Sequence, residues 1–173
     1  VIVEELKPIS GIEFCVLIGS SGGDEYARLS VSEKGVEQLY NDVDILLVVE
    51  NKQELAASLN EAQSRISERL NLKWVDFLIW NRLELKRKRN TIFYYDMCRR
   101  HKVVLGDEAA FRSLLHFFDS SEISTYDIRA LYRTRSWAVL SLYSSEGLLD
   151  SNQVIRNYQF AKVVFAIADF LCL

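Results

Sequence analysis

The chain has 173 residues, of which 49% are hydrophobic and 26% are charged, with a formal net charge of −3. This composition supports a hydrophobic core and excludes a disordered chain. The slightly acidic balance also argues against a protein that binds nucleic acid over its whole surface.

The first forty residues predict a strand, a glycine turn and an irregular stretch. Residues 13–18, EFCVLI, are a short apolar run typical of a buried strand. They lead into GSSGG at 19–23, where glycines permit positive φ and close approach to the backbone. Residues 24–40 are polar and loosely alternating, so we expect a hairpin or an irregular excursion there.

The next forty residues predict a strand, a helix and a second strand. Residues 44–49 are β-branched and Leu-rich, which suits a strand covered on both faces. Asn51 can cap the following helix, with Glu54 at the N3 position. Residues 73–80, KWVDFLIW, predict the next strand. The helix between the strands is indicated by apolar residues spaced three and four apart: Leu55, Leu59, Ala62, Ile66 and Leu70.

The pattern then becomes helical. Residues 93–101 predict a helix or turn, and KVVL at 102–105 predicts a short strand. Helical spacing follows over 111–118, 124–143 and 151–171. We therefore predict an α/β (α+β) fold class, with a first domain over residues 1–107 and a helical C-terminal region over residues 108–173.

Cysteine usage and hydropathy indicate the compartment. Cys15, Cys98 and Cys172 form no CxxC pair, and His101 and His116 complete no zinc-ligand spacing. We predict reduced, mostly buried thiols. With no apolar run of ~18 residues and no visible signal peptide, we expect a cytoplasmic protein without membrane contact.

Three aspartates carry the candidate chemistry. Asp42 and Asp44 open the apolar strand NDVDILLVV, and side chains two apart share a face of a strand. Two carboxylates so close repel, and a divalent cation such as Mg²⁺ would offset that repulsion. Asp76 lies in the next predicted strand, which a strand–helix–strand unit can place nearby. Three converging carboxylates make a two-metal site conceivable.

The glycine turn offers a second candidate feature. Backbone N–H groups and a serine hydroxyl in such a turn can hold phosphate. The chain lacks GxxxxGK[ST], so the turn is not a P-loop.

The combination of Gly19-Ser20, Asp42-Val43-Asp44 and Asp76 resembles the signature of the DNA polymerase β-like nucleotidyltransferase superfamily. The resemblance covers roughly residues 10–80, and the helical tail looks like that of stand-alone prokaryotic members. Two departures are visible. The interval between the Gly-Ser turn and the first aspartate is longer than in compact members. Asp24 and Glu25 also stand where such members often carry a basic residue.

The resemblance implies a small mixed-sheet nucleotidyltransferase fold and transfer of an NMP group from an NTP, with release of pyrophosphate. It implies that Asp42 and Asp44 hold both metal ions, Mg²⁺ or Mn²⁺, and that Asp76 completes the site of the ion that activates the acceptor. Ser20 and the Gly19 backbone would hold the β- and γ-phosphates. The acceptor stays open among small molecules, nucleic acids and proteins.

Alternatives remain open at every position. Asp42 and Asp44 can be a turn and an exposed strand start, Asp76 can face solvent on an edge strand, and Ser20 can be a plain turn residue. The basic run 82–89 and the pair Arg99-Arg100 can be solvated surface or can bind phosphate or an acceptor.

Tyr94 and Tyr95 can pack in the fold or stack on a base. For the whole protein, the alternative is an inactive nucleotidyltransferase-fold binding protein or an antitoxin-like partner protein. A homo-oligomer is also compatible with the sequence.

Overall fold

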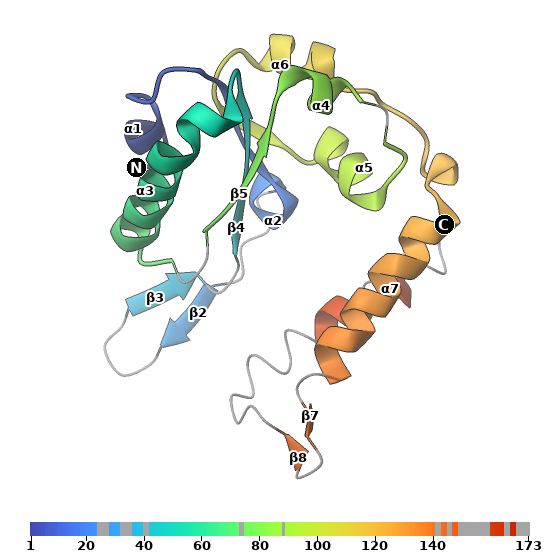
Figure 1. The fold of residues 1–173 in the computed structure, drawn as a ribbon. Helices are drawn as coiled ribbons and strands as arrows, with labels where there is room; N and C mark the ends of the chain where they lie inside the picture. Colours follow the sequence, from blue (N-terminus) through green and yellow to red (C-terminus); the bar gives the residue numbers. More distant parts are fainter. Residues whose placement is uncertain are drawn as a thin grey trace. The chain divides into compact units, whose positions relative to one another are not determined.

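The computed structural model describes residues 1–23, 28–31, 36–39, 42–72, 75–87, 89–140, 143–144, 147–148, 160–164 and 167–168. The chain forms two compact units (Figure 1). The first comprises Val1–Arg89 and Asp96–Phe117, and the second comprises Asn90–Tyr95 and Phe118–Leu173. The division at residue 107 predicted from sequence stays a prediction.

The first unit is built on a four-stranded mixed sheet. Its strands are β1 (Ile12–Ile18), β4 (Val43–Val49), β5 (Val75–Trp80) and β6 (Lys102–Leu105), in the order β5-β4-β1-β6. Strands β4 and β5 are parallel, whereas β1 is antiparallel to both β4 and β6. The predicted mixed α/β fold class is thereby confirmed.

Helix α3 (Lys52–Leu70) connects the two parallel strands, as a parallel pair requires. It begins where predicted, because the Asn51 side chain accepts a hydrogen bond from the Gln53 amide at 3.1 Å and donates one to Glu54 at 2.6 Å. It ends at Asn71, whose φ of 50° is the left-handed conformation that often terminates a helix.

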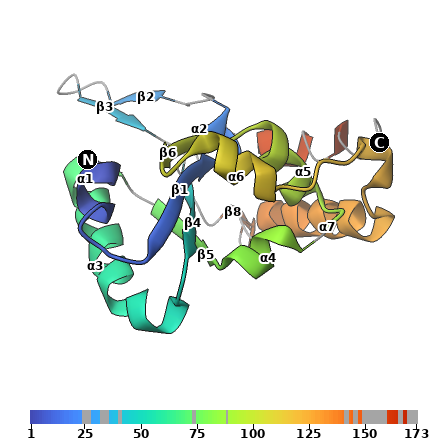
Figure 2. The same ribbon diagram turned by 90° about the horizontal axis from the view of Figure 1, so that it is seen from above.

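One face of the sheet packs against α3 and the short helix α1 (Ile2–Leu6), which lie side by side in Figures 1 and 2. Alternate strand residues point to this face because the strand period is two. Its buried residues include Leu6 from α1, Cys15 and Leu17 from β1, Ile45 and Leu47 from β4, and Leu59, Ala62 and Ile66 from α3.

The opposite face carries the other strand residues. Phe111 of α6 (Glu108–Leu114) is fully buried, and its ring centroid lies 5.5 Å from that of Phe14 on β1. The predicted helix over 111–118 is wrong in its second half, because Leu115 is already extended, with φ −80° and ψ 147°. Two further short helices are α4 (Arg82–Lys86), in the first unit, and α5 (Ile92–Arg99), which begins in the second unit and ends in the first.

The polar stretch after the glycine turn contains the predicted hairpin. Strands β2 (Arg28–Val31) and β3 (Val36–Leu39) pair antiparallel in a two-stranded sheet. The glycine turn itself is a single helical turn, α2 (Gly19–Gly22).

The second unit contains a 3-10 turn at Ser120–Glu122, helix α7 (Thr125–Leu140) and the small strands β7 (Tyr143–Ser144) and β8 (Gly147–Leu148). Tyr94 is fully buried and stacks on Phe118 with centroids 6.3 Å apart, which favours packing over base stacking for this residue. The helix predicted over 124–143 is too long, because α7 ends at Leu140 and Tyr143 already belongs to β7. Of the helix predicted over 151–171, residues 160–164 and 167–168 are helical, and the rest lies outside the described residues.

The cysteines behave as predicted where they are described. Cys15 and Cys98 are buried and free, and burial raises the pKa of their thiols to about 12 and about 11. Such thiols are weak nucleophiles near neutral pH. Cys172 lies outside the described residues. Among the described helices, none is long and apolar enough to cross a membrane.

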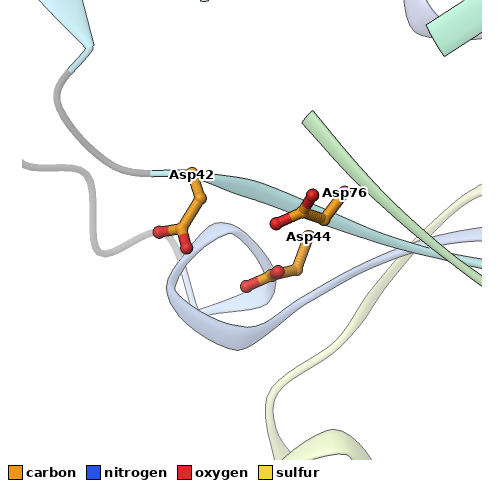
Figure 3. Close-up of side chains that lie close together, drawn as sticks. All are labelled: Asp42, Asp44 and Asp76. Carbon is orange, nitrogen blue, oxygen red and sulfur yellow. The ribbon is translucent and has the colours of Figure 1, made fainter. Parts of the chain in front are cut away.

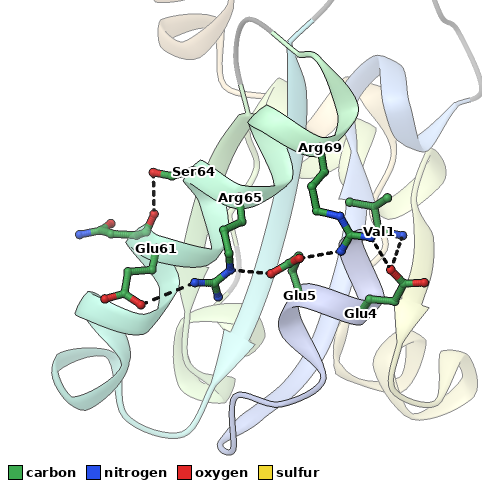
Figure 4. A network of polar contacts seen from close by, with 8 residues as sticks. Val1, Glu4, Glu5, Glu61, Ser64, Arg65 and Arg69 are labelled. Carbon is green, nitrogen blue, oxygen red and sulfur yellow. Dashed lines mark hydrogen bonds and ion pairs between the residues drawn. The ribbon is translucent and has the colours of Figure 1, made fainter.

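A cluster of ion pairs joins α1 to α3 (Figure 4). Glu5 accepts hydrogen bonds at 2.6 Å from both Arg65 and Arg69, and Arg69 also donates to Glu4 at 2.9 Å. The Glu5 side chain is 13% exposed, so these bonds are shielded better than an ordinary surface pair. The guanidinium groups lower the pKa of Glu5, chiefly through the hydrogen bond from Arg65.

We expect Glu5→Gln to lower the free energy of unfolding at pH 7, because the neutral amide cannot replace the charged acceptor. The Glu5 pKa is lowered in the folded state. Its stabilisation is therefore complete above the unfolded-state value of about 4.3 and is lost as pH falls through the folded value. The difference between wild type and variant in urea unfolding should shrink over that acidic range.

Glu61→Gln is the matched control. Glu61 contacts Arg65 at 3.6 Å, but its side chain is 74% exposed, so its loss should change stability little. Equal losses at positions 5 and 61 would contradict the role assigned to Glu5.

Candidate active site

The carboxylates of Asp42, Asp44 and Asp76, which the sequence predicts to converge, lie close together in the structure (Figure 3). Each offers one carboxylate oxygen, and these three oxygens all lie within 4.8 Å of one another. Asp42 directly precedes β4, Asp44 is its second residue, and Asp76 is the second residue of β5. The cluster therefore sits where two neighbouring parallel strands begin.

Strand register places Asp76 beside Asp44. In the parallel pair β4–β5, Asp44 lies directly opposite Asp76, just as Val43 lies opposite Val75. Val43 and Val75 belong to the core beneath α3. Because side chains alternate, Asp44 and Asp76 project from the face of the sheet away from α3. Asp42, two residues before Asp44, shares that face.

The three acids differ in exposure. Asp42 and Asp44 are partly buried, whereas Asp76 is exposed, and β5 lies at the end of the described strand order. Asp76 therefore has the solvent-facing, edge-strand position that the sequence left open as an alternative. What singles out Asp76 is its position next to two other carboxylates.

The glycine turn lies against this cluster. Gly19 has a φ of 60°, and a methyl group added there would lie 2.9 Å from an Asp44 carboxylate oxygen. Position 19 thus requires glycine for two reasons: its backbone conformation, and the space that a side chain would take from the Asp44 carboxylate. Ser20 follows in the same helical turn and is partly buried. Its role as a phosphate ligand stays a prediction.

The residues present fit a divalent cation. Hard cations prefer carboxylate oxygens, and Mg²⁺ usually takes one or two of them and completes its shell with water and substrate phosphate. Three acids this close also repel one another at neutral pH, and a bound cation would offset that repulsion. Asp42, Asp44 and Asp76 are the residues that would hold the ion.

No family model and no curated protein matches this chain. Among solved structures, a toxin–antitoxin with AMP-PNP is 16% identical, with 82% of this chain and 94% of that chain covered and a TM-score of 0.43. The toxin–antitoxin MntA-HepT is 15% identical, with 82% and 92% covered and a TM-score of 0.41. Likenesses this distant carry no argument about the activity or partners of this chain.

The described residues of the basic run, 82–87 and Arg89, lie at the other end of β5 from the acids. Asp76 and Trp80, the last strand residue, are roughly 13 Å apart along the strand, and the run begins beyond Trp80. Arg82 forms an ion pair with Glu13 at 2.5 Å, and the Arg89 guanidinium lies 4.3 Å from the Trp80 ring centroid. These contacts agree with a surface role for the run. Its distance along β5 separates it from the aspartates.

The second basic group, around Arg99 and Arg100, lies near the end of the strands at which the acids are found. Strand β6 begins at Lys102, which pairs with Leu17 near the end of β1, and the next residue of β1, Ile18, pairs with Asp44. The sequence left this pair open between solvated surface and phosphate binding. More than fifty residues separate it from Asp44, so only the strand pairing shows that the two lie at the same end of the sheet.

Proposed function

We propose that this protein is a Mg²⁺- or Mn²⁺-dependent nucleotidyltransferase that transfers an NMP group from an NTP, such as ATP, to an acceptor. The observation that carries the proposal is the gathering of Asp42, Asp44 and Asp76 within 4.8 Å at the start of two parallel strands. A triphosphate is itself polyanionic, so an anionic cluster can accept it only together with cations. The glycine turn beside Asp44 would hold the phosphates through its backbone N–H groups.

In the proposed reaction a nucleophilic oxygen of the acceptor forms a bond to the α-phosphorus and loses its proton. The bond from that phosphorus to the bridging oxygen breaks, and pyrophosphate leaves. A bound divalent cation would neutralise charge on the phosphates as this exchange proceeds. Asp42 and Asp44 are held by the buried strand β4, which fixes their positions. Asp76 is exposed and therefore lies where an acceptor arriving from solvent can reach it.

The experiment that tests the proposal compares two labels on the same nucleotide. The protein is incubated with cell extract, Mg²⁺ or Mn²⁺, and each NTP labelled on either the α- or the γ-phosphate. We expect the α-label to appear on an acceptor and the γ-label to be released as pyrophosphate, with both events abolished by EDTA. Transfer of the γ-label instead would indicate a phosphotransferase and would overturn the proposal.

The same experiment separates the rival function. A protein that binds NTP and metal with no transfer to any acceptor would be a non-catalytic binding module or a partner protein with this fold. Equilibrium dialysis with each NTP, run beside the labelling assay, distinguishes that result from a chain that binds no nucleotide at all.

A further inference from the structure

A cationic side chain lies at the end of the glycine turn away from the aspartates. In the sequence, Asp24 and Glu25 follow the turn, and no basic residue stands within four positions of it on either side. The fold supplies one from elsewhere in the chain: Arg100, the residue after α5.

Both the backbone and the side chain of Arg100 lie close to the glycine turn. A methyl group added at Gly22 would collide with the Arg100 carbonyl oxygen and would lie 2.8 Å from that of Leu17. The backbone of Arg100 therefore packs directly on the turn. A methyl group added at Gly23 would lie 3.2 Å from Arg100 Nε and 3.6 Å from one of its terminal nitrogens, so the guanidinium lies against Gly23.

Sheet pairing explains this placement. The chain enters β6 at Lys102, opposite Leu17, and Leu17 and Ile18 lead directly into the turn. Residues just before β6 must therefore lie next to the turn. The position of the Arg100 backbone follows from the pairing of β6 with β1.

The turn thus separates two opposite charges. A Cβ atom at its first residue, Gly19, would meet the carboxylate of Asp44, and one at Gly23, which follows the turn, would meet the guanidinium of Arg100. A helical turn of this length spans about 6 Å, which lies within the length of a triphosphate chain. A triphosphate laid along the turn would place its inner phosphate near the acids and its outer phosphates near Arg100.

We propose that Arg100 binds the outer phosphates of the nucleotide and gives the site its preference for triphosphates over monophosphates. The guanidinium is planar and permanently charged, and it forms paired hydrogen bonds with phosphate oxygens. Arg100 is exposed, so a phosphate can reach it. This inference rests on the proposed function, because it assigns a residue to the same nucleotide site.

The test measures binding of each NTP and the corresponding NMP to the full chain in Mg²⁺, by equilibrium dialysis with labelled nucleotide. We expect Arg100→Gln to weaken triphosphate binding about tenfold and to leave monophosphate binding within about twofold of wild type. Arg100→Lys should recover part of the loss, because it restores the charge without the fork.

Arg87→Gln is the matched control, since it removes the same charge from an exposed residue at the other end of the sheet. It should leave both affinities unchanged. Thermal melts of all variants verify that they are folded.

Two results would overturn the inference while leaving the proposed function intact. One is normal triphosphate binding by Arg100→Gln, and the other is an equal loss of triphosphate and monophosphate binding. If wild type binds no NTP with Mg²⁺ present, the proposed function fails and the assignment of Arg100 fails with it.

Discussion

Replacing Asp44 with asparagine should reduce nucleotide transfer at least about 100-fold while the protein stays folded. Asparagine keeps the size of the side chain but removes the charge that would hold a cation. Asp44 is central to the cluster, since it lies opposite Asp76 in the sheet and against Gly19 in the turn. Transfer of the α-label under saturating Mg²⁺ measures the loss.

The same substitution should leave the thermal stability of the protein unchanged or raise it. Removing one of three neighbouring negative charges relieves their repulsion, so the melting temperature of Asp44→Asn in EDTA should equal or exceed that of wild type. Added Mg²⁺ should raise the melting temperature of wild type more than that of the variant, because a bound ion stabilises the folded state and the variant should bind it more weakly. A variant that melts lower than wild type in EDTA would show that Asp44 has a structural role.

Glu50→Gln provides the matched control for this prediction. Glu50 is an exposed carboxylate that follows β4 at the end opposite Asp44, so its replacement changes net charge equally. It should leave transfer and the Mg²⁺ response unchanged. Unchanged transfer by Asp44→Asn would remove the acidic cluster from the chemistry.

The largest effect on stability is expected at Leu47. This residue is fully buried on β4, pairs with Cys15 on one side and Ile79 on the other, and belongs to the core beneath α3. Leu47→Ala should lower the free energy of unfolding by about 2–5 kcal/mol, because it leaves a cavity that a central strand cannot easily close. Urea unfolding with an unchanged m-value measures the loss.

Leu83→Ala is the matched control for Leu47. Leu83 is 79% exposed on α4, so the same chemical change should alter stability by no more than about 0.5 kcal/mol. A loss below about 1 kcal/mol at Leu47 would mean that the core relaxes around the deletion. Because β4 also carries Asp44, the transfer rate of folded Leu47→Ala would show whether core packing positions the acids.

Local patterns predicted most of the first unit. The strand at 44–49, the capped helix beginning after Asn51 and the strand at 102–105 agree with the structure within a few residues. Each depends on interactions between residues close in sequence, such as the Asn51 cap. The predictions failed where local pattern and packing disagree: Leu115 and Phe118 keep helical spacing but follow the end of α6.

The candidate site divides in the same way. The sequence by itself determined that Asp42 and Asp44 share a face, because the alternation of side chains along a strand needs no partner. Only the tertiary structure decided that Asp76 joins them, since this depends on the register between β4 and β5. It also decided that Asp76 is exposed and that Arg100 lies against the glycine turn. Strand order and register arise from packing across the whole sheet, and no short stretch of sequence contains them.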